Sequence, residues 1–234
     1  MNLIQKNNTY KKNYVEGIEN GSQEDYYENG NIHERSFKRN GLYDSLFISY
    51  YKDFAGVKQN VCYYVKGLIE GDFMAYYTNG NLQLKCKYIH NKVEGSSEEY
   101  YENNILKEKG EFAEGKKIGK WVSFYRDEKL YIKGNYKNDK YDSLWTVYFP
   151  NGKMKQQGFY KNGMAEGSWN FYYESGVLSS HGNYVKDDKE GPWNFYFDSK
   201  KPKLQSENNF QKGKLNGIPK NYNEKGKLIE RGAN

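Results

Sequence analysis

The chain has 234 residues, a formal net charge of +6 and a mean hydropathy of −1.08. Charged residues make up 28% of it, as in many disordered chains, but aromatic residues make up 18%, and disordered chains are poor in aromatics. The composition therefore excludes a disordered chain. No apolar run approaches the roughly 20 residues of a membrane span, and the first residues contain no signal-peptide hydrophobic region, so we expect a soluble, cytoplasmic protein.

The sequence repeats itself with a period of 24 residues. The segment Gly119-Lys120-Trp121 recurs as Ser143-Leu144-Trp145, as Gly167-Ser168-Trp169 and as Gly191-Pro192-Trp193. In the same frame the units begin at Gly21, Ser45, Gly71, Gly95, Gly119, Ser143, Gly167, Gly191 and Gly217. A period of this size indicates a repeat array, in which each unit packs on its neighbours.

Each unit has the signals of a β-hairpin. Counting from its opening residue, position 3 is Trp or Phe in most units, positions 6 and 7 are an aromatic pair, position 16 is Gly or Cys and position 18 is aromatic. A turn after the aromatic pair, such as Asn29-Gly30 or Asn151-Gly152, suits a two-residue hairpin turn. The second strand is followed by a seven-residue connection such as 160–166, which leads to the next unit.

These signals predict an all-β fold: a repeat array of about nine 24-residue β-hairpins that form one elongated, twisted open antiparallel sheet. Residues 1–20 are expected to be an N-terminal capping segment and half-repeat, and residues 21–234 a single repeat domain. Side chains alternate along a strand, so positions 3, 5 and 7 share one face while positions 4 and 6 share the other. Both faces then carry stacked rings, which serve as the core of a single-layer sheet.

The two cysteines, Cys62 and Cys86, occupy the same position in adjacent units. Equivalent positions of consecutive hairpins are two strands apart, roughly 10 Å, which is too far for a disulfide. We therefore expect free thiols that fill a slot where other units have glycine, namely Gly110, Gly134, Gly158 and Gly182.

The chain has no constellation typical of catalysis. The histidines His33, His90 and His181 fall at different repeat positions in different units, so they do not converge, and two cysteines are too few for a zinc motif. No glycine-rich phosphate loop occurs in a suitable context. We expect a protein that is not an enzyme, with no cofactor and no metal.

The segment Gly110–Trp121, together with the Tyr-Tyr-x-x-Gly-x-Leu pattern that follows in other units, resembles the MORN repeat in its bacterial variant form. The resemblance extends from about Tyr14 to Leu228. It implies an open, twisted antiparallel sheet of stacked hairpins shaped like a half-pipe. Bacterial chains of this kind are often called YwqK-like antitoxins, which are thought to neutralise a protein toxin. Gln23, Ser97 and Pro219 replace the position-3 aromatic, so the first, fourth and last units depart most from the pattern.

The aromatic residues on the position-3 face are one candidate binding surface. Rings exposed along a groove would mark a partner site, while rings that pack on one another would only hold the sheet together. The candidate partner-binding residues are Phe73, Trp121, Tyr125, Trp145, Trp169, Tyr173 and Trp193.

A second candidate is positive charge near the C-terminus. Basic and acidic residues cancel over residues 1–120, so the whole excess of +6 lies in residues 121–234. Lysines there could protect the last edge strand, or they could attract an acidic protein or anionic lipid through Lys212, Lys214 and Lys220. Nucleic acid is not expected as a partner, because acidic residues are interspersed and no dense arginine cluster is present.

Two functional hypotheses follow. The first is a non-catalytic scaffold that binds a protein partner in the groove of the sheet and could be an antitoxin that neutralises a toxin. The alternative is a peripheral membrane protein that binds anionic lipid through its basic C-terminal repeats. Open sheet edges also predict a homodimer.

Overall fold

The computed structural model describes residues 9–229, and all of the regular structure in this range is β-strand. The chain divides into two compact parts, each made of several 24-residue repeats. They are called the first unit, which ends at Lys116, and the second unit, which starts at Lys117. Residues 1–8, which belong to the expected capping segment, and residues 230–234 lie outside the described range.

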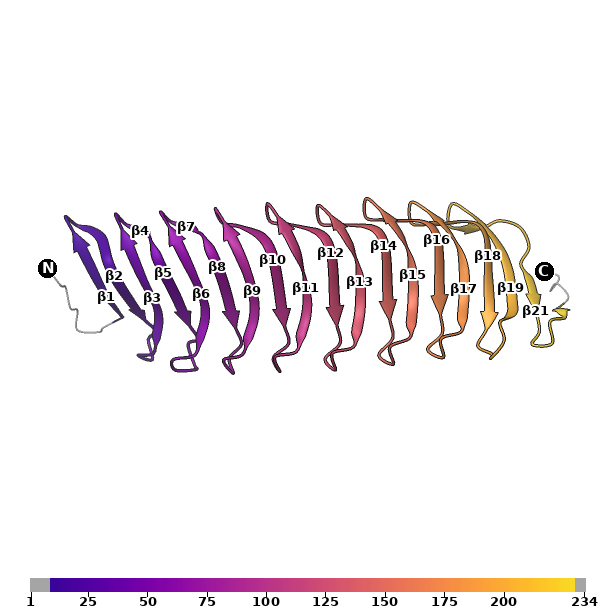
Figure 1. Cartoon of the computed structure of the whole chain (residues 1–234), viewed down its shortest axis with the longest axis horizontal. Coiled ribbons are helices and arrows are strands. Elements are labelled where there is room, and N and C mark those ends of the chain that lie inside the picture. The colour runs from indigo at the N-terminus through magenta and orange to yellow at the C-terminus, as the bar shows by residue number, and fades with distance from the viewer. Residues whose placement is uncertain (1–8, 230–234) are drawn as a thin grey trace. The chain divides into compact units, whose positions relative to one another are not determined.

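The first unit is built from consecutive hairpins (Figure 1). Its strands are β1 (Tyr10–Val15), β2 (Ile18–Tyr26), β3 (Ile32–Arg39), β4 (Leu42–Tyr43), β5 (Ser45–Tyr50), β6 (Lys58–Val65), β7 (Leu68–Ile69), β8 (Gly71–Tyr76), β9 (Leu82–Ile89), β10 (Lys92–Tyr100) and β11 (Leu106–Ala113). The longer strands pair antiparallel with the next long strand along the chain, and β4 and β7 extend that pairing at one end.

The second unit has the same construction. Its strands are β12 (Lys116–Phe124), β13 (Leu130–Lys137), β14 (Lys140–Tyr148), β15 (Met154–Lys161), β16 (Met164–Tyr172), β17 (Leu178–Val185), β18 (Asp188–Phe197), β19 (Lys203–Gln211), β20 (Lys214–Leu215), β21 (Lys220–Tyr222) and β22 (Leu228–Ile229). They too pair antiparallel in chain order. The predicted fold class, an all-β array of hairpin repeats in open antiparallel sheet, is confirmed.

The two-residue turns lie at the opposite end of the hairpin from the predicted one. At 40–41, 66–67, 162–163 and 212–213, among others, both residues have positive φ, which is the type I′ geometry that matches strand twist. These dipeptides fall inside the segments that the sequence indicated as connections. The predicted turns, such as Asn29-Gly30, form longer loops instead, in which, for example, the Tyr27 amide donates to the Asn31 carbonyl at 2.8 Å.

The core is a row of position-3 side chains, each beside a position-16 residue of the preceding strand. Where the ring is Trp, the neighbour is Gly: Trp145 beside Gly134, Trp169 beside Gly158 and Trp193 beside Gly182. Where it is smaller, a neighbour is larger: Ser97 pairs with Cys86 of the preceding strand, and Phe47 and Phe73 pair with Cys62 and Cys86 of the following strand. Volume is therefore matched at these pairs.

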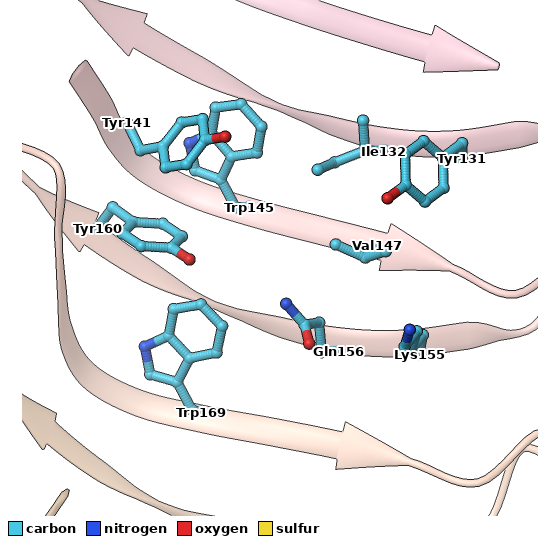
Figure 2. Close-up of a pocket in the computed structure, with 9 residues that line it drawn as sticks. All are labelled: Tyr131, Ile132, Tyr141, Trp145, Val147, Lys155, Gln156, Tyr160 and Trp169. Atoms are coloured by element: carbon cyan, nitrogen blue, oxygen red, sulfur yellow. The ribbon is translucent and has the colours of Figure 1, made fainter. Parts of the chain in front are cut away.

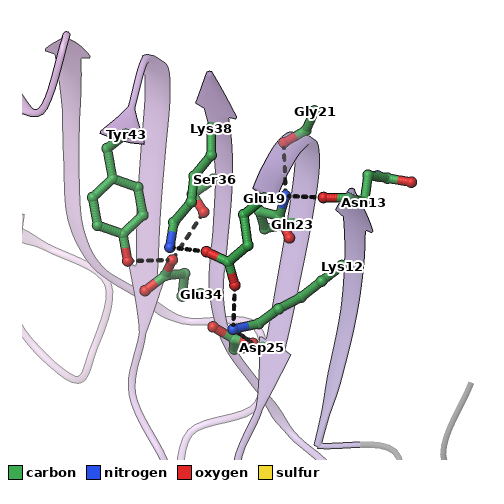
Figure 3. Close-up of polar contacts among 10 residues, drawn as sticks. All are labelled: Lys12, Asn13, Glu19, Gly21, Gln23, Asp25, Glu34, Ser36, Lys38 and Tyr43. Carbon is green, nitrogen blue, oxygen red and sulfur yellow. Dashed lines mark hydrogen bonds and ion pairs between the residues drawn. The ribbon is translucent and has the colours of Figure 1, made fainter. Parts of the chain in front are cut away.

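The first hairpins replace this aromatic core with a polar one (Figure 3). Gln23, at position 3, is 2% exposed, and its amide donates to the carbonyls of Asn13 at 3.2 Å and Gly21 at 3.1 Å. Beside it, the Glu19 carboxylate lies between two amino groups, 3.0 Å from Lys12 Nζ and 2.5 Å from Lys38 Nζ.

A buried carboxylate, Glu34, belongs to the same polar core. It accepts hydrogen bonds from the Ser36 hydroxyl and the Tyr43 hydroxyl, both at 2.9 Å. The buried charge in the first hairpins is thus paired or hydrogen-bonded, as burial requires.

Candidate functional site

The second unit places four tryptophans in one row, on the first strand of successive hairpins. Trp121, Trp145, Trp169 and Trp193 lie on β12, β14, β16 and β18 and are 4%, 5%, 3% and 1% exposed. Because their strands are separated by glycine-bearing strands, each indole can lie flat over a neighbouring backbone. Three indole N–H groups donate to main-chain carbonyls of the preceding strand: Trp145 to Asn135 at 2.9 Å, Trp169 to Phe159 at 3.2 Å and Trp193 to Asn183 at 3.1 Å.

Tyrosine rings from position 18 separate the tryptophans. Tyr136 contacts Trp145 edge-on with ring centroids 5.1 Å apart, and Tyr160 does the same with Trp169 at 5.1 Å. Tyr184 repeats the contact with Trp193 at 5.1 Å. Edge-to-face packing of this kind suits the charge distribution of aromatic rings. The row is therefore a fixed wall of rings, and most of the indole area serves packing.

In three of the four tryptophan repeats, the side chain two positions before the opening residue covers the tryptophan of that repeat. The Lys117 amino group lies 3.8 Å from the Trp121 ring centre, and the Lys189 amino group lies 4.3 Å from that of Trp193. Tyr141 covers Trp145, with ring centroids 4.2 Å apart. Burial lowers the pKa of Lys189, in keeping with an amino group held against rings. Ala165 takes this place before Trp169 and adds no ring or charge there.

A hollow opens on this face around Val147 (Figure 2). It has a volume of about 240 Å³ and is lined by Tyr131, Ile132, Tyr141, Trp145, Val147, Lys155, Gln156, Tyr160 and Trp169. Ile132 and Gln156 are the cross-strand partners of Val147 on its two sides, so these three residues form one row. Tyr131 and Tyr141 are 41% and 38% exposed and offer rings to solvent.

The hollow lies in a repeat whose position-5 residue is smaller than that of the two following repeats. Val147 is at position 5, where the next two units have Phe171 and Phe195. Phe171 stacks on Trp169 with centroids 5.9 Å apart, and Phe195 packs on Trp193 at 6.2 Å. Valine cannot reach as far as phenylalanine, so the space beside Trp145 stays open.

The polar groups at the hollow are few and distinct. Lys155 is exposed, and within residues 9–229 no carboxylate lies at ion-pair distance from its amino group. Gln156 adds an amide, and burial raises the pKa of Tyr160. This arrangement can hold an apolar side chain while offering a cation to a neighbouring carboxylate.

The predicted aromatic site residues are divided by the structure. Trp145 and Trp169 line the hollow, whereas Trp121 and Trp193 are buried in the row outside it. The hydroxyls of the position-7 residues Tyr125 and Tyr173 donate to the carbonyls of Tyr148 and Tyr196, each at 2.7 Å, so they tie one hairpin to the next. Phe73 lies in the first unit, with its ring 5.3 Å from that of Tyr88.

Sequence reasoning missed seven residues of the hollow, namely Tyr131, Ile132, Tyr141, Val147, Lys155, Gln156 and Tyr160. The signal that could have found them is the change at position 5 from Val147 to Phe171 and Phe195 in the next two repeats.

The lysines of the lipid hypothesis lie around β20 and β21. The Lys220 amino group is 3.4 Å from the Glu207 carboxylate, with its side chain 61% exposed. The Lys212 backbone N–H donates to Glu190 at 2.9 Å, and Lys214 pairs with Gln211 across the turn. No helix between residues 9 and 229 is long and apolar enough to cross a membrane. In the same range, no three His, Cys, Asp or Glu side chains group as metal ligands would.

Comparison with known proteins gives a family match. The model of the MORN repeat variant matches residues 19–38, 69–90, 93–114, 117–138, 141–162 and 165–186. No curated protein matches the chain. One similar solved structure is described as "Crystal Structure of TcdB2-TccC3", with 9% sequence identity and a TM-score of 0.16. That match covers 91% of this chain but only 15% of the other.

The matched segments together make up more than half of the sequence and follow the hairpins seen in both units. The chain therefore belongs to the MORN repeat variant family.

Proposed function

We propose that this chain is a non-catalytic protein-binding scaffold and that the hollow at Val147 receives an apolar side chain of the partner. The supporting observation is the hollow on the aromatic face, at the repeat before those that carry Phe171 and Phe195, with exposed rings beside it. Exposed tyrosines around a small pocket are the usual anchors of protein interfaces.

The size of the hollow favours a protein partner over a small-molecule substrate. Its volume of about 240 Å³ is below the roughly 300–1,000 Å³ of typical ligand pockets. One aliphatic or aromatic side chain would fill it, and an acidic residue of the partner would reach Lys155. Neither requirement involves a chemical step.

The finer form of the proposal is that the partner is a protein toxin, which the chain neutralises by covering its surface. It rests on the resemblance of the repeat to that of YwqK-like antitoxins. Co-expression with the captured partner tests it, because an antitoxin must restore growth that the partner alone prevents. A partner that does not affect growth would rule out the toxin and leave the scaffold.

The scaffold itself is tested by purifying the tagged chain from its native lysate and measuring the affinity of the protein that co-purifies. Val147→Phe fills the hollow with the residue that the next two repeats have at this position, so the fold should accept it. Affinity should fall at least tenfold. Phe159→Ser changes a residue that is 51% exposed and alternates with Gly158, on the opposite face, and should leave the affinity unchanged.

Two results would contradict this proposal. A folded Val147→Phe variant that binds the partner as tightly as the wild type would exclude the hollow as the site. Purification without any stoichiometric protein partner would contradict the scaffold function as a whole.

A further inference from the structure

The first unit exposes a line of aliphatic side chains, here called the aliphatic ladder, at the two-residue turns of successive hairpins. Val15 pairs with Ile18 across the first turn, and Val65 pairs with Leu68 across the third. The ladder consists of Val15, Ile18, Leu42, Val65, Leu68 and Ile89, which are between 38% and 55% exposed. Exposed apolar residues are ordinary when scattered, but a contiguous row of them marks an interaction surface.

The fold does not require aliphatic residues at these positions. At the turn that follows Ile89, the cross-strand partner of Ile89 is Lys92. Lys92 occupies the repeat position that Leu42 and Leu68 have in the earlier hairpins of the first unit. In the second unit, Lys137 pairs with Lys140 across the equivalent turn. Lysine is therefore compatible with the same backbone geometry, and the ladder needs another explanation than folding.

The ladder lies on the sheet face opposite the buried rings of the first unit. Tyr63 and Val65 alternate along β6 with the position-16 and position-18 residues Cys62 and Tyr64, whose side chains point to the aromatic face. Leu46, 37% exposed, is the cross-strand partner of Tyr63, 49% exposed, and widens the apolar surface. Within the first unit, the strands contact their neighbours in the sheet, and no second layer covers this face over residues 9–116.

The spacing of the ladder fits an α-helix that crosses the strands. Equivalent residues such as Ile18, Leu42 and Leu68 are two strands apart, or about 9.6 Å. A helix repeats the same face every seven residues, or about 10.5 Å, whereas alternate residues of an extended strand recur every 6.6–6.8 Å or so. Each heptad of a helical partner would thus lie against the aliphatic residues of one hairpin, over three successive hairpins.

Charge at the ladder points to acidic flanks on that helix. A hollow of about 320 Å³ lies on the ladder between Val65, Lys66, Leu68, Glu70 and His90. The Glu70 carboxylate already accepts the His90 backbone N–H at 2.8 Å. Lys66 is exposed, and within residues 9–229 no carboxylate lies at ion-pair distance from its amino group.

We propose that the aliphatic ladder docks an amphipathic α-helix of a partner protein, with aliphatic residues at heptad spacing and carboxylates beside them. The surface is separate from the hollow at Val147, so either proposal can fail without the other.

The test uses a synthetic 21-residue helical peptide with leucine at heptad positions a and d and glutamate at e and g, labelled for fluorescence anisotropy. The double variant Leu42→Lys/Leu68→Lys should weaken its binding at least tenfold. Leu144→Lys is the matched control. Leu144 lies in the second unit and is 39% exposed, and the preceding repeat has Lys120 at the same position. A peptide with lysine at e and g should bind at least tenfold more weakly than the acidic one.

Several outcomes would overturn the proposal. The acidic peptide fails to bind the wild type, or it binds the double variant equally well. Vesicles of phosphatidylglycerol bind the wild type and not the double variant while the peptide does not bind, which would assign the ladder to a membrane. A dimer that the double variant dissociates in sedimentation would assign it to a second copy of the chain.

Discussion

The indole ring of Trp169 lies directly over the backbone of Gly158 in the preceding strand. A β-carbon added to Gly158 would come within 2.0 Å of the indole Cδ2 atom, closer than any side chain can be. Trp145 has the same relationship to Gly134, and Trp193 to Gly182. Glycine is required here by the space that the ring occupies and not by the backbone conformation, because these three glycines do not have positive φ.

Gly158→Ala is therefore expected to destabilise the protein. The added methyl group must displace the Trp169 ring. Overpacking of this kind should lower the free energy of unfolding by about 1–3 kcal/mol. Urea unfolding gives the free energy of unfolding. In a double-mutant cycle, Trp169→Phe should restore part of the loss, since Phe73 already pairs with the larger Cys86. Simple additivity of the two changes would contradict the volume-matching explanation.

Tyr173→Phe should cost about 1 kcal/mol of unfolding free energy, the net contribution of an ordinary hydrogen bond. The Tyr173 hydroxyl donates to the Tyr196 carbonyl at 2.7 Å and links successive hairpins. The ring itself should stay in place, because Phe149 occupies the same position in the previous repeat. Thermal and urea unfolding would measure the loss. Unchanged stability would show that water replaces the hydroxyl without penalty.

The sequence predicted the period, the hairpins and the aromatic row, because each depends on residues that recur in register along the chain. Turn placement was wrong, since dipeptides such as Asn162-Gly163 were taken as part of a connection although both residues have positive φ. The hollow was missed because it depends on Val147, Ile132 and Gln156 together, and these become neighbours only when the strand register is known. The aliphatic ladder was missed for the same reason.

Cys62 and Cys86 should be inert to thiol reagents in the folded protein. Burial raises the pKa of each thiol to about 11, from an ordinary 9.0. At pH 8 an aromatic disulfide reagent should react with neither thiol until urea unfolds the chain, and then with both. Rapid modification of the folded protein would contradict their burial at 2% and 5% exposure.

The same pKa shifts predict a loss of stability in alkali. The unfolded state releases the thiol protons near pH 9 and the folded state near pH 11, so the thiol contribution is intact below pH 9 and is lost as the pH rises toward 11. Cys62→Ser should reduce this dependence, and serine is compatible with the site because Ser36 fills the equivalent position. Equal pH dependence in the variant and the wild type would argue against the thiol as the cause.

Acid should weaken the polar core of the first hairpins. Hydrogen bonding from the Lys38 amino group is the largest cause that lowers the pKa of Glu19, and Lys12 acts in the same direction. Because the folded pKa is below the ordinary 4.5, the stabilisation is complete above pH 4.5 and is lost as the pH falls through the lowered value. Glu19→Gln removes the titrating group but keeps an oxygen that can accept from Lys38. We expect the variant to be less stable than the wild type at pH 7 and to lose less stability between pH 7 and pH 3. Identical acid sensitivity of the two proteins, measured by urea unfolding at both pH values, would place the acid-labile interaction elsewhere.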